Sequence, residues 1–184
     1  MLWAGGIGLV ALGTRAADEA ARFSSTLLVA TAALAEGFFA RTVILAAGTP
    51  RGEVIGLVLN RPSPEPLPAW AATRERPERV SGVLFGGPLA PDRLFAFAEG
   101  GLPGETSLPV APSLRLVAGD AAVRAAIGAS SGRVRIYRGY AGWAPGQLAA
   151  EMAGGFWKAA AIEPDQVFSA APGSLWQQLG GGAT

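Results

Sequence analysis

The chain has 184 residues, of which 50% are hydrophobic and 16% charged, so one domain with a sizeable core is expected and disorder is not. The formal net charge of +1 predicts no strong attraction to nucleic acid. Cysteine and histidine are both missing, which excludes disulfides, thiolate nucleophiles, a Ser-His-Asp triad and the common zinc sites. We expect no metal and no cofactor.

Residues 1–22 are predicted to form an N-terminal extension, packed poorly against a domain that spans residues 23–184. The apolar run Leu2–Leu12 has the length of a signal-peptide core, and Ala16 suits the position before a cleavage site. The run lacks a preceding positive charge and is too short to span a bilayer. A cytoplasmic protein is expected, and the alternative is export with residues 1–16 as a signal peptide.

The first third of the domain is dominated by short apolar runs. Such runs, bounded by polar residues, predict central strands buried on both faces. A loop at Gly48–Gly52 carries a proline and indicates a hairpin-like connection. The three predicted strands are Ser25–Thr31, Thr42–Ala47 and Val54–Leu59.

The middle of the chain alternates loops with short elements. Residues 61–79 are rich in Pro, Glu and Arg and predict a surface loop with a short helix at Leu67–Thr73. A second loop is expected at Glu99–Pro109, and Asp120 suits the N-cap of a helix at Ala121–Ile127. Short strands are predicted at Val83–Phe85, Arg93–Phe97 and Leu114–Val117.

Residues Arg133–Tyr137 alternate between apolar and basic side chains, which predicts a half-exposed strand. Arg133, Arg135 and Arg138 would then form a small basic stripe beside Tyr137. Such a stripe is found on surfaces that bind single-stranded nucleic acid. A solvated strand edge that resists aggregation is the more ordinary interpretation, and we favour it.

The segment Gly139–Leu148 packs two large aromatics, three glycines and a proline into a predicted turn that opens into a helix at Gln147–Ala153. If the turn is open, Tyr140 and Trp143 beside the helix could bind an anionic or polar ligand. Alternatively, Trp143 lies in the core and Gln147 satisfies the backbone of the turn. A strand at Gln166–Phe168 and a helix at Ser174–Leu179 complete the chain.

Two further segments are candidate sites. Asn60 and Arg61 end a buried strand and could present an amide and a guanidinium to an anion, or could bond the backbone where the strand exits. Gly86 and Gly87 precede a proline but lack the spacing and lysine of a phosphate-binding loop, so a tight turn is favoured. The candidate ligand-binding residues are therefore Asn60, Arg61, Gly86, Gly87, Tyr140, Trp143 and Gln147. No catalytic or metal-binding residue is assigned, because the carboxylates show no pairing.

Five collinear blocks resemble the YqgE/AlgH family of bacterial proteins. They are Leu27–Thr31, Phe38–Val43 (FFARTV), Gly56–Pro62 (GLVLNRP), Phe85–Leu89 (FGGPL) and the GYAGWxxGQLxxE segment from Gly139. The chain departs from the family pattern at Ala46–Gly48, where members carry an acidic residue and a His, and at Glu36–Gly37, where Asp-Pro is common. Any role of those family residues is absent here.

The mixture of elements lacks regular βαβ alternation and any internal repeat, so a single α+β domain is expected. The resemblance implies a mixed β-sheet with a small barrel-like part surrounded by helices. It also implies a regulatory protein, described in the family as a transcriptional regulator of undefined molecular activity.

From these observations we expect a non-catalytic binding or regulatory protein that acts on transcription indirectly, through a protein or small-molecule partner. Direct DNA binding should be weak, because the chain has no helix-turn-helix pattern and no strongly basic face. One alternative is an enzyme that uses carboxylate and Arg chemistry in a cleft by the GYAGW segment. Another is an exported envelope protein of the same fold.

Overall fold

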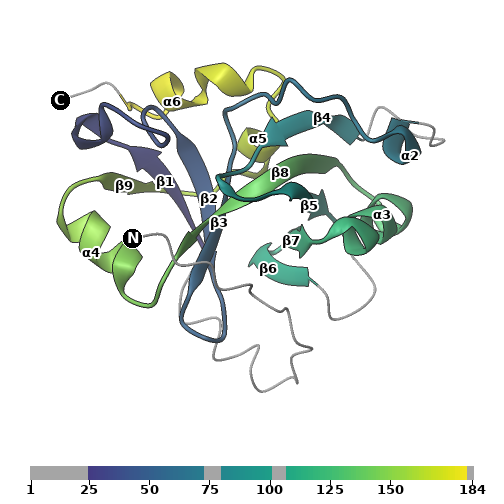
Figure 1. Cartoon of the computed structure of the whole chain (residues 1–184), viewed down its shortest axis with the longest axis horizontal. Coiled ribbons are helices and arrows are strands. Elements are labelled where there is room, and N and C mark those ends of the chain that lie inside the picture. Colours follow the sequence, from purple (N-terminus) through teal and green to yellow (C-terminus); the bar gives the residue numbers. More distant parts are fainter. Residues whose placement is uncertain (1–24, 73–79, 101–106, 182–184) are drawn as a thin grey trace.

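The computed structural model describes residues 25–72, 80–100 and 107–181 (Figure 1). The N-terminal extension proposed for residues 1–22 lies outside these ranges, as do residues 73–79 of the Pro-rich loop. The strands are β1 Thr26–Ala30, β2 Val43–Gly48, β3 Val54–Val58, β4 Val80–Phe85, β5 Leu89–Glu99, β6 Ser107–Ala111, β7 Leu114–Ala118, β8 Val134–Trp143 and β9 Trp157–Ala160. The helical elements are η1 Ala32–Leu34, α2 Ala69–Ala72, α3 Asp120–Ala129, α4 Gln147–Ala153, α5 Pro164–Val167, η3 Pro172–Ser174 and α6 Leu175–Gln178.

The strands form one sheet in the order β6-β7-β5-β8-β3-β2-β1-β9, with β4 paired to β8 outside that path. All pairs are antiparallel except β4 with β8, which is parallel. Strand β8 joins the two halves, because its first residues pair with β4 and β5 and its last three with β3. The sheet curls into a half-barrel with helices around it (Figure 1). This confirms the α+β fold.

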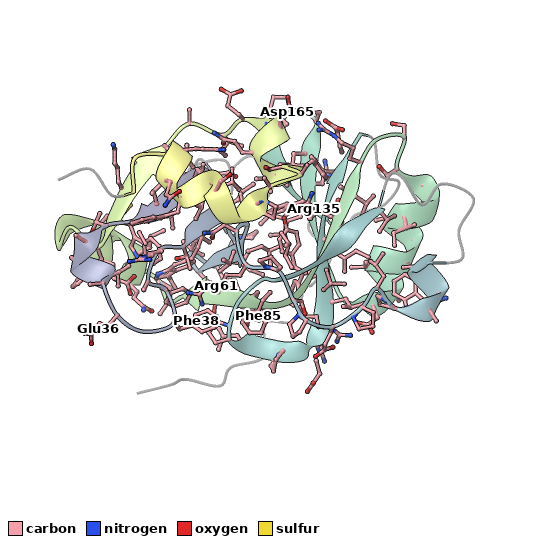
Figure 2. The ribbon with its side chains drawn as sticks, turned by 90° about the horizontal axis from the view of Figure 1, so that it is seen from above. Glu36, Phe38, Arg61, Phe85, Arg135 and Asp165 are labelled. Carbon is pink, nitrogen blue, oxygen red and sulfur yellow. The ribbon has the colours of Figure 1, made fainter. Side chains whose placement is uncertain are left out.

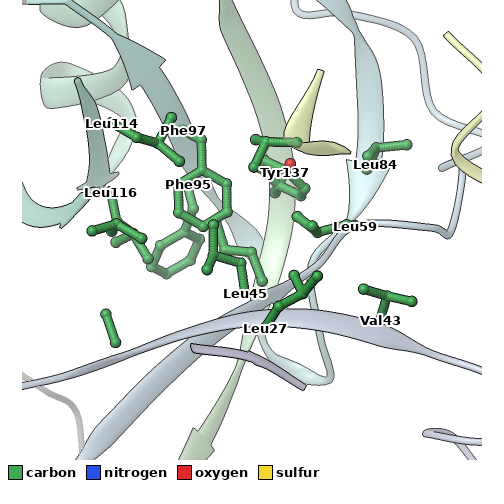
Figure 3. Close-up of a cluster of buried hydrophobic side chains, with 14 of the residues drawn as sticks. Leu27, Val43, Leu45, Leu59, Leu84, Phe95, Phe97, Leu114, Leu116 and Tyr137 are labelled. Atoms are coloured by element: carbon green, nitrogen blue, oxygen red, sulfur yellow. The ribbon is translucent and has the colours of Figure 1, made fainter. Parts of the chain in front are cut away.

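The concave side of the curled sheet holds the largest core. Its side chains come from β1 to β8, with Val167 of α5 and Leu175 of α6 packed against them. Figure 3 shows leucine and valine side chains around Phe95, Phe97 and Tyr137. The apolar runs of β2 and β3 are buried throughout, as expected for strands covered on both sides.

Two smaller clusters cover the outer faces of the sheet. Helix α3 packs its buried Val123 and Ala126 against β5, β7 and β8. At the other end of the sheet, α4 packs beside β9 and contributes Leu148 to a cluster that contains Trp143 and Trp157 (Figure 1). The aromatic cluster at this second end becomes the candidate site.

Strand β8 differs most from its sequence-based expectation. It runs to Trp143, so the GYAGW segment is strand, and the turn comprises only the residues before α4. It is also central and not an edge strand, since it pairs on both sides. Arg135 is consequently only 5% exposed. The alternation of polar and apolar residues therefore led to a wrong prediction, an exposed side chain, for this arginine.

Other boundaries changed for local reasons. The expected strand at Gln166–Phe168 is the end of helix α5, which begins with Pro164 and a capping box between Glu163 and Gln166. Asp120 does not cap α3 through its side chain; its Oδ1 accepts a hydrogen bond from the Leu94 N–H at 3.1 Å instead. Strands β6 and β9 were not expected, and β6 occupies part of the expected loop Glu99–Pro109.

Candidate functional site

The turn between β8 and α4 aligns two polar side chains on one helix face. Gly146 takes a left-handed conformation with φ of 79° and starts the seven-residue helix α4. Gln147 and Glu151 stand one helical turn apart, which places them side by side. The Gln147 side chain accepts a hydrogen bond from the Ala144 N–H at 3.1 Å and donates one to Glu151 Oε1 at 2.9 Å. Gln147 therefore fixes both the turn and the carboxylate.

Glu151 is held by two tryptophans as well. The indole N–H groups of Trp143 and Trp157 each donate to its Oε2 at 2.8 Å. Trp143 comes from the end of β8 and Trp157 from the start of β9, so one carboxylate joins two strands and a helix. All three donors are neutral groups, which orient the carboxylate but leave its negative charge in place.

A pocket of about 260 Å³ opens beside this carboxylate. The rings of Trp143 and Trp157 are nearly perpendicular, with centroids 6.0 Å apart, and Phe39 meets Trp157 edge to face at 5.9 Å. Phe156 lies at the pocket and is 38% exposed. The described residues that line it are Leu34, Phe39, Gly142, Trp143, Gln147, Glu151, Phe156 and Trp157. A negatively charged group thus sits in an aromatic cavity.

Asn60 supports the loop that carries Phe39. Its Oδ1 accepts the Val43 N–H at 2.9 Å, and its Nδ2 donates to the Arg41 carbonyl at 2.8 Å. Arg41 has a φ of 56°, a conformation rare for residues other than glycine. The buried amide of Asn60 therefore bonds the backbone, and it acts on the pocket only through the position of the loop.

Arg61 contacts the same loop. It donates to the Ala40 carbonyl at 3.1 Å, and its guanidinium lies over the Phe38 ring at 4.8 Å from the centroid. Figure 2 shows Arg61 beside Phe38 and Phe85, whose rings are 5.4 Å apart. Partial burial lowers the pKa of Arg61 from its ordinary value. Arg61 is not among the residues that line the pocket.

Gly86 and Gly87 lie where the chain after β4 crosses β8. A Cβ on Gly86 would overlap the Gly139 carbonyl, and one on Gly87 would overlap the Tyr140 backbone. The Gly86 N–H donates to the Arg138 carbonyl at 2.8 Å. These glycines permit close contact between two backbones and lie outside the pocket lining.

Tyr140 and Trp143 do not share a site. Tyr140 packs on the concave core, with its ring 5.2 Å from Phe95, whereas Trp143 belongs to the outer cluster around α4. Burial raises the pKa of Tyr140 above its usual value. Of the seven candidate residues, only Trp143 and Gln147 line the pocket.

The expected basic stripe of three arginines, one just before β8 and two within it, is not formed. Arg133 pairs with Glu99 and Asp165, each at 2.9 Å, and Arg138 pairs with Glu65 at 2.6 Å. Arg135 is buried and donates to the Ser169 carbonyl at 3.0 Å. The proposed basic surface for single-stranded nucleic acid is therefore absent from the described part of the chain.

Comparison with known proteins shows to which family the chain belongs. A family model described as AlgH-like matches residues 27–181. The chain belongs to the AlgH-like family. A UPF0301 protein of Streptomyces avermitilis is 36% identical over 178 residues, which cover 88% of this chain and 86% of the relative. A UPF0301 protein of Mycobacterium bovis is 34% identical over 85% of this chain and 80% of its own length.

Two solved structures share the fold. The solution structure of the AlgH protein from Pseudomonas aeruginosa has a TM-score of 0.67 and 28% identity, covering 85% of this chain and 86% of that one. A crystal structure from Corynebacterium diphtheriae has a TM-score of 0.65 and 25% identity, covering 85% of both chains. These likenesses confirm the family relationship inferred from the five sequence blocks.

Sequence reasoning missed most of the pocket. Glu151 lies in the GQLxxE part of the family block, four residues after Gln147 on a correctly predicted helix, and that spacing alone places the two side chains together. Phe39, Phe156 and Trp157 offered no comparable signal, because they reach the pocket through a loop, the turn after α4 and a strand that was not predicted.

Proposed function

We propose that this AlgH-like protein is a non-catalytic binding protein whose ligand or partner group enters the pocket beside Glu151. The observation that carries the proposal is the Glu151 carboxylate, oriented by three neutral donors at the wall of an aromatic cavity. Such a site offers shape, apolar surface and one charge, which are the usual elements of ligand recognition.

The chemistry of the lining favours binding over reaction. Among the described residues, those that line the pocket include no Ser, Thr or Tyr that could serve as a nucleophile or proton donor, and no Arg to accompany the carboxylate. The enzyme that was considered as an alternative needs both carboxylate and Arg groups in this cleft. We therefore favour a binding role over catalysis.

Regulation of transcription would be indirect under this proposal. The net charge is +1, and the arginines of the β8 region are engaged with acidic side chains or a carbonyl. Few phosphates could be neutralised, so duplex DNA should bind weakly and with a shallow dependence on salt. A protein or small-molecule partner fits the pocket better than DNA does.

No helix in residues 25–72, 80–100 and 107–181 has the length and hydropathy that a membrane span requires. We propose a cytoplasmic protein, with export and an envelope role as the alternative. Intact-mass analysis of the protein from its own host would distinguish the two, because cleavage near Ala16 would shorten the chain.

A thermal-shift screen with metabolites and nucleotides tests the binding role. A ligand of the native state raises the melting temperature, by an amount that depends on its concentration relative to Kd. We expect at least one compound to stabilise the wild type and a Trp70→Ala control but not a Phe156→Ala variant. Trp70 lies on the α3 side of the sheet, far from the pocket in sequence and outside its lining. Stabilisation that is equal in all three proteins would contradict the proposed site.

A further inference from the structure

The pocket beside Glu151 combines a negative charge with aromatic walls. Glu151 forms no salt bridge with any Arg or Lys among residues 25–72, 80–100 and 107–181. Its hydrogen bonds come from two indoles and an amide, which are neutral. The carboxylate thus keeps an uncompensated negative charge within a largely apolar surrounding, where its attraction for a cation is stronger than in water.

The aromatic walls add to this potential. The face of an aromatic ring carries a negative quadrupole that attracts cations, most strongly for Trp. Trp143, Trp157, Phe39 and Phe156 all line the cavity, and the planes of the Trp143–Trp157 and Phe39–Trp157 ring pairs are inclined by 80° and 68°. These rings therefore do not form a flat stack.

The hydrogen-bonding capacity of the pocket selects among cations. Oε2 already accepts two indole N–H groups, and Oε1 accepts one amide N–H. Apart from the two indoles, the only other polar side chain in the lining given by the described residues is Gln147, whose oxygen and nitrogen both have partners. A primary ammonium or a guanidinium brings three or five N–H donors that need acceptors, whereas a dimethylated ammonium brings one and a trimethylated ammonium brings none.

We propose that this pocket binds a methylated ammonium group. The inference rests on the proposed binding function and names the chemistry of the ligand. The cavity of about 260 Å³ lies just below the range of pockets for drug-sized ligands, about 300–1,000 Å³, and suits a single small group. A free quaternary amine and a methylated lysine side chain carry the same group, and the experiment separates them.

The test is a titration of the full chain followed by ¹H–¹⁵N NMR of the tryptophan indole N–H signals. Choline is the probe, and its uncharged isostere 3,3-dimethyl-1-butanol is the matched control. We expect choline to shift the signals of Trp143 and Trp157 saturably and to leave that of Trp70, which packs in the cluster beside α3, in place. The isostere should bind at least about tenfold more weakly, because it lacks the charge.

Two variants test the contributions of the Glu151 charge and of the aromatic walls to binding. Glu151→Gln should weaken choline binding at least about tenfold, and Asp92→Asn, which removes an exposed carboxylate outside the lining, should leave it unchanged. Because Glu151→Gln also disturbs the two hydrogen bonds that hold α4 to β8 and β9, Phe156→Ala provides a second test at a residue that is 38% exposed. It should weaken choline binding while the remaining spectrum stays native.

The outcomes separate this inference from the proposed function. Equal binding of choline and the isostere at Trp143 and Trp157 would overturn the cation inference and leave a binding pocket. Failure of choline to shift either signal would overturn the cation inference as well, and the thermal-shift screen would then decide the binding role independently. A trimethyllysine peptide that binds more tightly than choline would identify a protein side chain as the source of the group, and the reverse order would identify a free amine.

Discussion

At the scale of single residues, Trp143 shows how one side chain serves both core and site. It is 4% exposed, packs in the cluster around α4, and donates to Glu151. Its burial agrees with the interpretation that Trp143 lies in the core, while its indole N–H orients the Glu151 carboxylate at the pocket. The burial of Trp143 and its proposed binding role are therefore compatible and are not alternatives.

Trp143→Ala should lower the free energy of unfolding by about 3–5 kcal/mol, the usual cost of removing a large buried aromatic. Trp143→Phe keeps most of the apolar contact and loses the indole N–H, so it should cost clearly less. Urea denaturation of both variants measures the difference. If Trp143→Ala unfolded at the same urea concentration as the wild type, Trp143 would not be part of the core.

At the scale of elements, the glycines at the crossing of β4 and β8 allow the sheet to curl. Gly87 and Gly139 each lack the Cβ that would overlap the backbone of the other segment. Gly139 also has a φ of 66°, a conformation that costs most other residues about 1–2 kcal/mol. The change in direction of β8 at this point sends Tyr140 to the concave core and Trp143 to the outer cluster.

Gly87→Ala should destabilise the protein by at least about 2 kcal/mol, because the new methyl group would force two backbones apart. Gly146→Ala is the matched control: its φ is also positive, at 79°, but a Cβ there meets open space. The control should cost only about 1–2 kcal/mol. Equal melting temperatures for the two variants would show that backbone contact at Gly87 is unimportant.

The ion pair between Glu99 and Arg133 joins the end of β5 to the start of β8. The side-chain hydrogen bond from Arg133 lowers the pKa of Glu99 below its ordinary value of 4.5. A carboxyl group with a lower pKa in the folded state stabilises the protein above that ordinary value. The contribution is lost as pH falls through the lowered pKa.

Glu99→Gln should therefore make the free energy of unfolding fall less steeply below about pH 4.5, and at pH 7 it should lower that free energy by no more than about 1 kcal/mol, since the pair is partly exposed to solvent. Arg133→Gln should flatten the acid side in the same direction, because it removes the bond from the other partner. The free energy of unfolding at pH 7, 5 and 3 measures both effects. Unchanged acid sensitivity in both variants would contradict this assignment.

At the scale of the whole molecule, the curled sheet encloses the tyrosines. The chain has two tyrosines, Tyr137 and Tyr140. Burial is the main cause that raises the pKa of each, and Tyr137 is completely buried. In the unfolded chain both side chains should ionise near pH 10. The native state thus binds more protons above that pH than the unfolded state does.

Stability should therefore fall as pH rises above about 10, with a limiting slope of about 1.4 kcal/mol per pH unit for each tyrosine that stays neutral in the native state. The absorbance of the Tyr137 tyrosinate at 295 nm should appear only as the protein unfolds, and the Tyr140→Phe variant isolates that signal. Tyr137→Phe should reduce the slope more than Tyr140→Phe, since Tyr137 is the more buried. Tyrosinate absorbance in the fully native Tyr140→Phe variant near pH 10 would contradict the burial of Tyr137.

The sequence alone determined the family, the α+β class and most of the strands of the concave core. Apolar runs such as those of β2 and β3 favour burial, and the Pro145-Gly146 turn before Gln147 favours the start of a helix, so local chemistry was sufficient for these elements. Blocks such as GLVLNRP and GYAGW identified the family because several of them occur in the same order.

Only the tertiary structure decided the environment of Arg135 and the composition of the pocket. Alternation along β8 does not reveal how many strands flank it, and two flanking strands buried an arginine that was expected at an edge. More than a hundred residues separate Phe39 from Trp157, and Glu151 lies shortly before Trp157. The three side chains meet because β1 pairs with both β2 and β9. Contacts across that distance depend on sheet order, which local sequence patterns do not encode.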